Sequence, residues 1–176
     1  MKTLILVVGP SGVGKSTACR ALVEALPAAA YVDSDWCRCM HPFAWDEETI
    51  GLIRANMTAL LANYLRAPRI EHVILSYGLH GPRKRILDGV LGALAAEGLA
   101  FRFCPLLLAC MLDEHVARLE ADGRDEARIR RAIEDTRDPY VGCDYPLVDS
   151  TGLTVPETVE RIVQVLAERY GVPPRG

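Results

Sequence analysis

The sequence predicts an α/β domain in which one parallel sheet is covered by helices on both faces. Short apolar runs alternate along the chain with longer segments whose apolar residues recur at helical spacing. The chain has 176 residues, which corresponds to one domain at roughly 100–200 residues per domain. Neither a linker nor an internal repeat divides it, so we expect a single domain over residues 1–176.

Five short apolar segments are the expected strands: Leu4–Val8, Ala29–Val32, His72–Ser76, Ala100–Ala109 and Pro146–Asp149. Their continuous apolar runs are typical of strands that are buried on both faces of a parallel sheet. The first run ends at Gly9 and the second at Asp33, so turn-forming residues close both strands.

Helices are expected in the segments Ser16–Leu26, Glu48–Leu65, Lys84–Glu97, Asp113–Glu120, Glu126–Thr136 and Thr154–Tyr170. Gly98 is the expected C-cap of the third helix. Thr154 and Glu157 fit a capping box at the start of the last helix. We expect the tail Val172–Gly176, which is rich in Pro and Gly, to be frayed.

Composition and charge exclude several classes of protein. The formal net charge of −3 argues against a general nucleic-acid coat. The longest apolar runs, around Leu4–Val8 and Leu106–Leu112, are too short to span a bilayer. The six cysteines contain no Cys-x-x-Cys pair and indicate free thiols in a reducing cytoplasm. Cys37 and Cys39 lie beside a candidate site, so a thiol near the substrate stays open.

Residues 9–17 fit the phosphate-binding P-loop motif G-x-x-x-x-G-K-[ST] at every required position, between a buried strand and an amphipathic helix. Glycines let backbone N–H groups turn toward phosphate oxygens, and the helix N-terminus adds its positive dipole. Lys15 is expected to reach the β- and γ-phosphates, and the Ser16 hydroxyl to ligate Mg²⁺. The expected nucleotide contacts are Gly9, Ser11, Gly12, Val13, Gly14, Lys15, Ser16 and Thr17.

Two carboxylates, Asp33 and Asp35, follow the second expected strand. In an extended segment they point the same way, toward the crevice at the carboxyl end of the sheet. Two close carboxylates do not both ionise easily, so one is expected to hold a proton or a Mg²⁺-bound water. We expect Asp35 to be the base that accepts the substrate hydroxyl proton, and Asp33 to orient metal-bound water. The alternative is an Asx turn that ends the strand.

Four further side chains are candidate contacts for the phosphoryl acceptor: Arg38, His41, His80 and Arg83. The first two lie just beyond the aspartates and could bind an anionic or hydroxylated acceptor. The other two lie on the loop after the third strand, at the same mouth of the crevice. Trp36 and Phe43 form either an apolar wall for a ring or ordinary packing. Lys84 and Arg85 are expected on a solvated helix face.

Five arginines fall between Arg118 and Arg131, interleaved with acidic residues. One interpretation is a salt-bridged pair of surface helices. The other is a lid over residues 118–137, hinged near Gly123, whose arginines neutralise the transferring phosphoryl group. Nucleic-acid binding is disfavoured here, because acids alternate with bases and aromatic residues are sparse.

The layout resembles the small P-loop kinases, among them shikimate kinase, gluconate kinase, chloramphenicol phosphotransferase and the kinase domain of polynucleotide kinases. The resemblance rests on the P-loop, on Asp33-Ser34-Asp35 and on the Asp149–Leu153 turn. It implies a three-layer P-loop NTPase fold with a five-stranded sheet in the order 2-3-1-4-5. It also implies that Arg118 and Arg124 are the lid contacts and that Thr151 lies beside the adenine. The glycine triplet that shikimate kinases carry after the third strand is absent, which puts shikimate in doubt.

Two other P-loop classes fit less well. The Asn-Lys-x-Asp sequence of GTPases is absent. The pair Asp113-Glu114, which resembles a motif of motor ATPases, is better explained as the acidic first turn of a helix.

The expected function is therefore Mg²⁺-dependent transfer of the γ-phosphoryl group of ATP, or of GTP, to a hydroxyl of a small metabolite or natural product. A monomer and a homodimer both fit the sequence. Two alternatives stay open: a kinase acting on the 5′-hydroxyl of a nucleic acid, and a nucleotide sensor without catalysis.

Overall fold

A computed structural model describes residues 1–173, apart from the side chains of Asp135, Arg137 and Asp138. It contains one all-parallel sheet of five strands in the order β2-β3-β1-β4-β5. The strands are β1 (Thr3–Val8), β2 (Ala29–Asp33), β3 (His72–Tyr77), β4 (Arg102–Ala109) and β5 (Leu147–Asp149). The predicted fold class and the strand order implied by the resemblance are confirmed.

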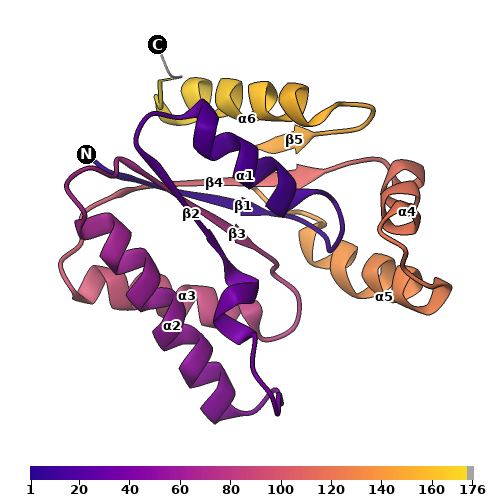
Figure 1. Cartoon of the computed structure of the whole chain (residues 1–176), viewed down its shortest axis with the longest axis horizontal. Coiled ribbons are helices and arrows are strands. Elements are labelled where there is room, and N and C mark those ends of the chain that lie inside the picture. Colours follow the sequence, from indigo (N-terminus) through magenta and orange to yellow (C-terminus); the bar gives the residue numbers. More distant parts are fainter. Residues whose placement is uncertain (174–176) are drawn as a thin grey trace.

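Helices cover both faces of this sheet: α1 (Lys15–Ala25), α2 (Glu47–Arg66), α3 (Arg83–Ala96), α4 (Leu112–Ala121), α5 (Glu126–Arg137) and α6 (Val155–Tyr170). One face carries α2 and α3, and the other carries α1 and α6, while α4 and α5 stand at one end of the sheet (Figure 1). Two short 3₁₀ helices, η1 (Ser34–Arg38) and η2 (Asp138–Tyr140), were not predicted. The capping box of Thr154 and Glu157 is present at the start of α6.

Strand β1 lies at the centre of the core, and every one of its residues is buried. Leu4, Leu6 and Val8 pack into the cluster beneath α2 and α3. Ile5 and Val7 pack into the cluster beneath α1 and α6. Because both faces are apolar, the strand is firmly held, and it fixes the position of the loop that follows Val8.

Strand β4 tolerates Pro105 because the neighbouring strand β5 is too short to pair with that residue. The N–H of Leu107 donates to Pro146 O, so the nitrogens of alternate residues on β4 face β5. Strand β5 pairs only with residues Leu107 to Ala109 and does not reach Pro105. The missing N–H of proline therefore costs no ladder hydrogen bond.

The expectation that Val172 belongs to a frayed tail is wrong. Gly171, in the left-handed conformation with φ 61°, turns the chain back over the end of α6. The N–H of Val172 donates to Leu166 O, and its side chain is 1% exposed. The rest of the predicted tail, from residue 174, lies outside the described residues.

Two expectations from composition can be compared with the structure. All six cysteines are free thiols, as predicted, and only Cys39 is exposed. Over residues 1–173, no helix combines the length and the apolar character needed to cross a membrane.

Candidate active site

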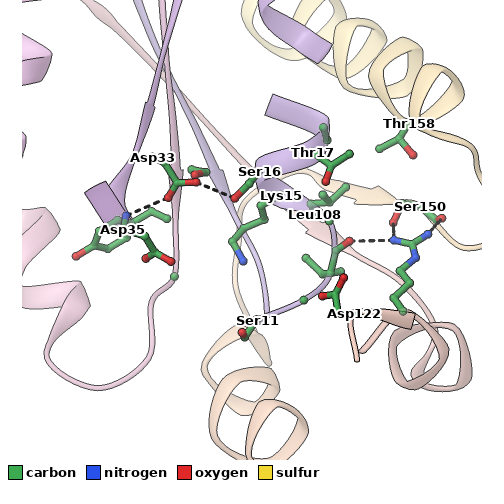
Figure 2. A pocket seen from close by; sticks show the side chains of 18 of the residues that line it. Ser11, Lys15, Ser16, Thr17, Asp33, Asp35, Leu108, Asp122, Ser150 and Thr158 are labelled. Atoms are coloured by element: carbon green, nitrogen blue, oxygen red, sulfur yellow. Dashed lines mark hydrogen bonds between the residues drawn. The ribbon is translucent and has the colours of Figure 1, made fainter. Parts of the chain in front are cut away.

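A cavity of about 630 Å³ lies at the carboxyl end of the sheet. The P-loop, the ends of β2 and β3, the helix α4 and the turn before α6 all contribute to its walls. Lys15 projects into it, with Asp33 and Asp35 on one side and Ser150 and Thr158 on the other (Figure 2). One continuous cavity therefore has two chemically different ends.

Two glycines explain why the P-loop takes its shape. A Cβ on Gly9 would lie 2.3 Å from the backbone oxygen of Leu108, so only glycine fits against β4. Gly14 begins α1 in the left-handed region, with φ 102°. The first turn of α1 holds neither a side-chain cap nor an acidic residue. Its N–H groups and positive dipole are therefore available to an anion.

Lys15 is held by the loop itself. Its Nζ donates to Gly9 O over 2.8 Å and to Pro10 O over 2.7 Å. Burial, opposed in part by the nearby charge of Asp35, lowers the pKa of Lys15 to about 8. Phosphate oxygens that replaced the two carbonyls would favour the charged ammonium.

Asp33 ends β2 and caps η1. Its carboxylate accepts hydrogen bonds from Ser16 Oγ (2.8 Å), Tyr31 OH (2.7 Å) and the N–H of Asp35 (3.0 Å). Burial acts to raise the pKa of Asp33, but the hydrogen bonds from the Asp35 N–H, Tyr31 and Ser16 together hold it below its ordinary value. The side chain is therefore ionised near neutral pH.

One expectation about the aspartates is corrected here. The backbone turns into η1 at Ser34, so Asp33 and Asp35 do not sit on one extended segment as predicted. The bond from the N–H of Asp35 to the Asp33 carboxylate is the Asx turn of the alternative interpretation. Asp33 accepts three hydrogen bonds and is ionised, so of the two expected alternatives a Mg²⁺-bound water is the one that suits it.

Ser16 and Asp33 are a suitable pair of ligands for Mg²⁺. Ser16 Oγ and Asp33 Oδ2 lie 2.8 Å apart and are both oxygen donors (Figure 2). Among the described residues, no group of three or more His, Cys, Asp or Glu side chains could hold a metal. Mg²⁺ at nucleotide sites uses one or two protein oxygens and takes its other ligands from phosphate and water, so the pair fits.

Asp35 lines the cavity at the end opposite Ser150 and Thr158, beside Arg38 and Arg83 (Figure 2). Its side chain is 62% exposed, and its Oδ1 accepts from Arg38 Nε over 2.9 Å. Arg83 Nη1 lies 4.0 Å from the same oxygen. One carboxylate thus faces two guanidinium groups, which leaves this end with excess positive charge.

Two buried nitrogen atoms at this end lack a partner in the part of the chain that the structure describes: His80 Nδ1 and Arg83 Nε. The residue Arg83 is only 7% exposed. Burial, together with the positive charges of Arg83, Lys15 and Arg38, lowers the pKa of His80 to about 4. Histidine at this position is therefore neutral near pH 7 and keeps hydrogen-bonding capacity for a ligand.

The two arginines proposed as lid contacts have different positions. Arg118 donates to Val13 O (2.9 Å), to Ser150 O (2.8 Å) and to Glu114 (2.8 Å). It therefore ties α4 to the P-loop and to the turn before α6.

Arg124 instead donates to Ser11 Oγ over 3.2 Å and pairs with Asp122 at 3.5 Å. It lies beside the loop on which phosphates are expected. Arg128 and Arg130 form exposed pairs with Asp125 and Glu126, as the surface-helix interpretation predicts.

Some predicted residues do not line the cavity. His41 is exposed and does not contribute to its walls, and neither do Trp36 and Phe43. Thr151 is also outside it, because its hydroxyl accepts from the N–H of Met111 and donates to Asp149. Every other residue predicted to contact nucleotide or acceptor lines the cavity except Gly9, whose carbonyl oxygen binds Lys15.

Three residues that the sequence analysis missed hold the P-loop in place. His115 Nε2 contacts Ser11 O at 2.8 Å, and the N–H of Ser11 donates to Thr136 Oγ1 over 2.9 Å. Tyr140 donates to Gly9 O over 2.8 Å. Each lies more than one hundred residues from its partner in the chain, so no local spacing could have indicated it.

Comparison with known proteins supports this description. A family model described as an AAA domain matches residues 5–138. No curated protein matches the chain. Solved structures do match, and the tunicamycin resistance protein of Deinococcus radiodurans is 20% identical, with a TM-score of 0.68 and coverage of 100% of this chain and 99% of that one.

Two further structures are similar over most of their length. A gluconokinase from Sinorhizobium meliloti 1021 is 18% identical, with a TM-score of 0.64 and coverage of 94% and 92%. An APS kinase from Mycobacterium tuberculosis, in complex with AMPPNP and APS, is 15% identical, with a TM-score of 0.60 and coverage of 94% and 97%. With the P-loop in place at the end of β1, the chain belongs to the AAA domain family and has the fold of the small P-loop kinases.

Proposed function

We propose that the protein is a kinase that transfers the γ-phosphoryl group of ATP to a hydroxyl of a small molecule. One observation carries this proposal: Lys15 and Asp35 line the same cavity, and two buried nitrogen atoms near Asp35, His80 Nδ1 and Arg83 Nε, have no partner among the described residues. A P-loop alone would serve nucleotide binding. A carboxylate beside open hydrogen-bonding capacity supports a second substrate.

The nucleotide would occupy the end formed by the P-loop and α6. Its phosphates would take the N–H groups at the start of α1, where the dipole of the helix favours them. Leu153, Val155 and Thr158 line the cavity at the start of α6 and offer a largely apolar surface for the base. The resemblance to ATP-binding kinases favours ATP, and GTP would fit the same surface.

Three groups of the protein would act on the phosphates. Lys15 would exchange the carbonyls of Gly9 and Pro10 for the β- and γ-phosphate oxygens. Ser16 and Asp33 would hold Mg²⁺, and the bound ion would neutralise negative charge on the phosphates. Arg124, beside Ser11, is the arginine better placed to stabilise the transferring group, while Arg118 braces the nucleotide end.

Asp35 would act on the acceptor. As the acceptor oxygen forms its bond to the γ-phosphorus, the bond from that phosphorus to the bridging oxygen of ADP breaks, and the hydroxyl proton passes to the Asp35 carboxylate. Arg38 and Arg83 flank this carboxylate, and neutral His80 lies beside Arg83. Two cations against one carboxylate favour an acceptor that carries a negative charge.

The free thiols bear on the compartment of the protein, and the cavity volume bears on the size of its ligands. The six free thiols support a reducing compartment such as the cytoplasm. The cavity volume of about 630 Å³ suits a nucleotide and a small second ligand better than a folded nucleic acid.

The test is ADP release from Mg·ATP in the presence of hydroxyl acceptors: sugar acids, sulfated and phosphorylated nucleosides, nucleoside and phenicol antibiotics, and a 5′-hydroxyl oligonucleotide. The proposal expects a small acceptor to stimulate release at least about tenfold, and Lys15→Ala to abolish that stimulation. Stimulation by the oligonucleotide alone would make the protein a nucleic-acid kinase. Tight ATP binding without stimulation by any acceptor would favour a sensor.

A further inference from the structure

Tyr140 joins two loops that the sheet leaves separate. The P-loop follows β1, and residues 78–82 form the loop that follows β3 and carries His80; we call it the acceptor loop. The two strands are neighbours, with Val8 opposite Tyr77. The hydroxyl of Tyr140 donates to Gly9 O over 2.8 Å and accepts from the N–H of Leu79 over 2.9 Å. One hydroxyl can make both bonds at once.

The surroundings of Tyr140 make this link strong. The residue is 8% exposed and packs in the apolar cluster beneath α2 and α3. Burial raises the pKa of Tyr140, so the hydroxyl keeps its proton and remains a donor to Gly9 O. Hydrogen bonds in such a low-dielectric setting are stronger than bonds in water.

The carbonyl of Gly9 has a second donor, Nζ of Lys15 at 2.8 Å. If Lys15 moves to the phosphates of a nucleotide, this buried carbonyl keeps one partner, because Tyr140 remains. Without the hydroxyl, the release of Lys15 would leave Gly9 O without either donor, which is unfavourable for a buried acceptor. Tyr140 therefore makes the movement of Lys15 easier.

We propose that Tyr140 is a positioning residue with two effects. It frees Lys15 to bind the β- and γ-phosphates, and it couples nucleotide binding at the P-loop to the position of the acceptor loop. This inference rests on the proposed function, because it requires that nucleotide phosphates occupy the P-loop. It adds a residue, from the segment after α5, that contacts neither substrate.

Calorimetric titration of Tyr140→Phe with Mg·AMPPNP and with AMP tests the first effect. AMP lacks the two phosphates that Lys15 would bind, so its affinity does not depend on releasing Lys15. The variant is expected to bind Mg·AMPPNP about tenfold more weakly than the wild type, and to bind AMP with unchanged affinity. An equal loss for both ligands would indicate a merely structural role and overturn the inference.

Tyr170→Phe is the matched control. Its hydroxyl also donates to a backbone carbonyl, Pro105 O at 2.6 Å, but the residue does not line the cavity. Its affinity for both ligands should equal that of the wild type.

Hydrogen exchange at the amide of Leu79 tests the second effect and can be read in the wild type alone. Mg·AMPPNP is expected to slow this exchange at least about threefold, since the amide donates to the hydroxyl that also holds Gly9. In Tyr140→Phe, exchange should be faster and insensitive to the nucleotide. Exchange that ignores Mg·AMPPNP in the wild type overturns the coupling.

Failure of the proposed function is distinguishable from failure of this inference. A wild type that does not bind Mg·AMPPNP, or binding that Lys15→Ala leaves intact, overturns the proposed function and the inference with it. Normal wild-type binding, sensitive to Lys15→Ala but unchanged in Tyr140→Phe, overturns only the role of Tyr140.

Discussion

Two regions of the cavity satisfy their polar groups in different ways. We call the region of the P-loop and Asp33 the phosphate end, and the region of Asp35, His80 and Arg83 the acceptor end. At the phosphate end, Lys15 bonds to two carbonyls, Asp33 accepts three hydrogen bonds, and Ser11 is contacted by His115, Thr136 and Arg124. At the acceptor end, His80 Nδ1 and Arg83 Nε have no partner in the described part of the chain, and Asp35 is 62% exposed.

Under the proposed function, the phosphate end would recognise a group that nucleotides share, and the acceptor end would recognise one particular substrate. At the phosphate end these side chains already have partners, and the fold fixes the backbone N–H groups at the start of α1 that stay available to an anion. Unsatisfied buried groups cost stability and persist where function needs them. Under the proposed function, the acceptor end would therefore decide which substrate is accepted.

Glycine substitutions test whether the phosphate end is the more rigid of the two. Gly9→Ala places a Cβ 2.3 Å from Leu108 O, which is backbone and cannot move aside. We expect a loss of at least about 3 kcal/mol in the free energy of unfolding. In Gly81→Ala, on the acceptor loop, the new Cβ meets open space at φ 60°, so about 1 kcal/mol is expected. Urea denaturation measures both, and equal losses would contradict the comparison.

The two aspartates should separate binding from catalysis. Asp35→Asn is expected to lower phosphoryl transfer at least about a hundredfold, because the base is lost, and to leave the affinity for Mg·AMPPNP unchanged. Asp33→Asn is expected to weaken Mg·AMPPNP binding about tenfold, since it alters the oxygen beside Ser16. Calorimetry and ADP release measure the two effects. Full transfer activity in Asp35→Asn would remove Asp35 from the role of base.

The sequence predicted the P-loop better than the segment around Asp33 and Asp35. The motif at residues 9–17 is local, and its chemistry follows from spacing along the chain. Lys15 and Ser16 both line the cavity, and their contacts with nucleotide and Mg²⁺ stay a prediction. The arrangement of Asp33 and Asp35 was predicted wrongly, because the 3₁₀ turn at Ser34 ends the alternation of an extended strand.

Contacts between distant segments could not be predicted. Thr136 and Tyr140 reach the P-loop because the chain after α5 returns beside β1, which only the packed fold determines. The candidate acceptor contacts that line the cavity follow the carboxyl ends of β2 and β3, so parallel topology was enough to indicate them. His41 lies in an irregular exposed segment, where topology gives no constraint.

The pH dependence of nucleotide affinity sharpens the account of the phosphate end. In the free protein the pKa of Lys15 is about 8, and phosphates bind its charged form, so the complex holds the proton to a higher pH. Affinity for Mg·AMPPNP should be greatest below pH 8 and fall as pH rises through it. The expected loss between about pH 7 and about pH 9.5 is roughly thirtyfold.

Lys15→Ala provides the control for this profile, because it removes the titrating group and should bind weakly with a flat dependence. His80, with a pKa of about 4, stays neutral over this range and does not contribute. A wild-type profile as flat as that of the variant would show that Lys15 does not contact the phosphates.

Replacement of Arg83 tests whether a group kept for binding at the acceptor end lowers the free energy of unfolding. Its guanidinium is buried, its Nε has no described partner, and its nearest carboxylate oxygen is 4.0 Å away. Arg83→Met keeps an apolar stem beneath Trp45, whose ring centre lies 5.7 Å from the guanidinium carbon, and removes a poorly paired buried charge. We expect a gain of about 1 kcal/mol in the free energy of unfolding by urea denaturation. Arg85→Met, at an exposed pair with Glu47, should change it by less than about 0.5 kcal/mol. A loss of stability in Arg83→Met would instead make this arginine a structural support of the acceptor loop.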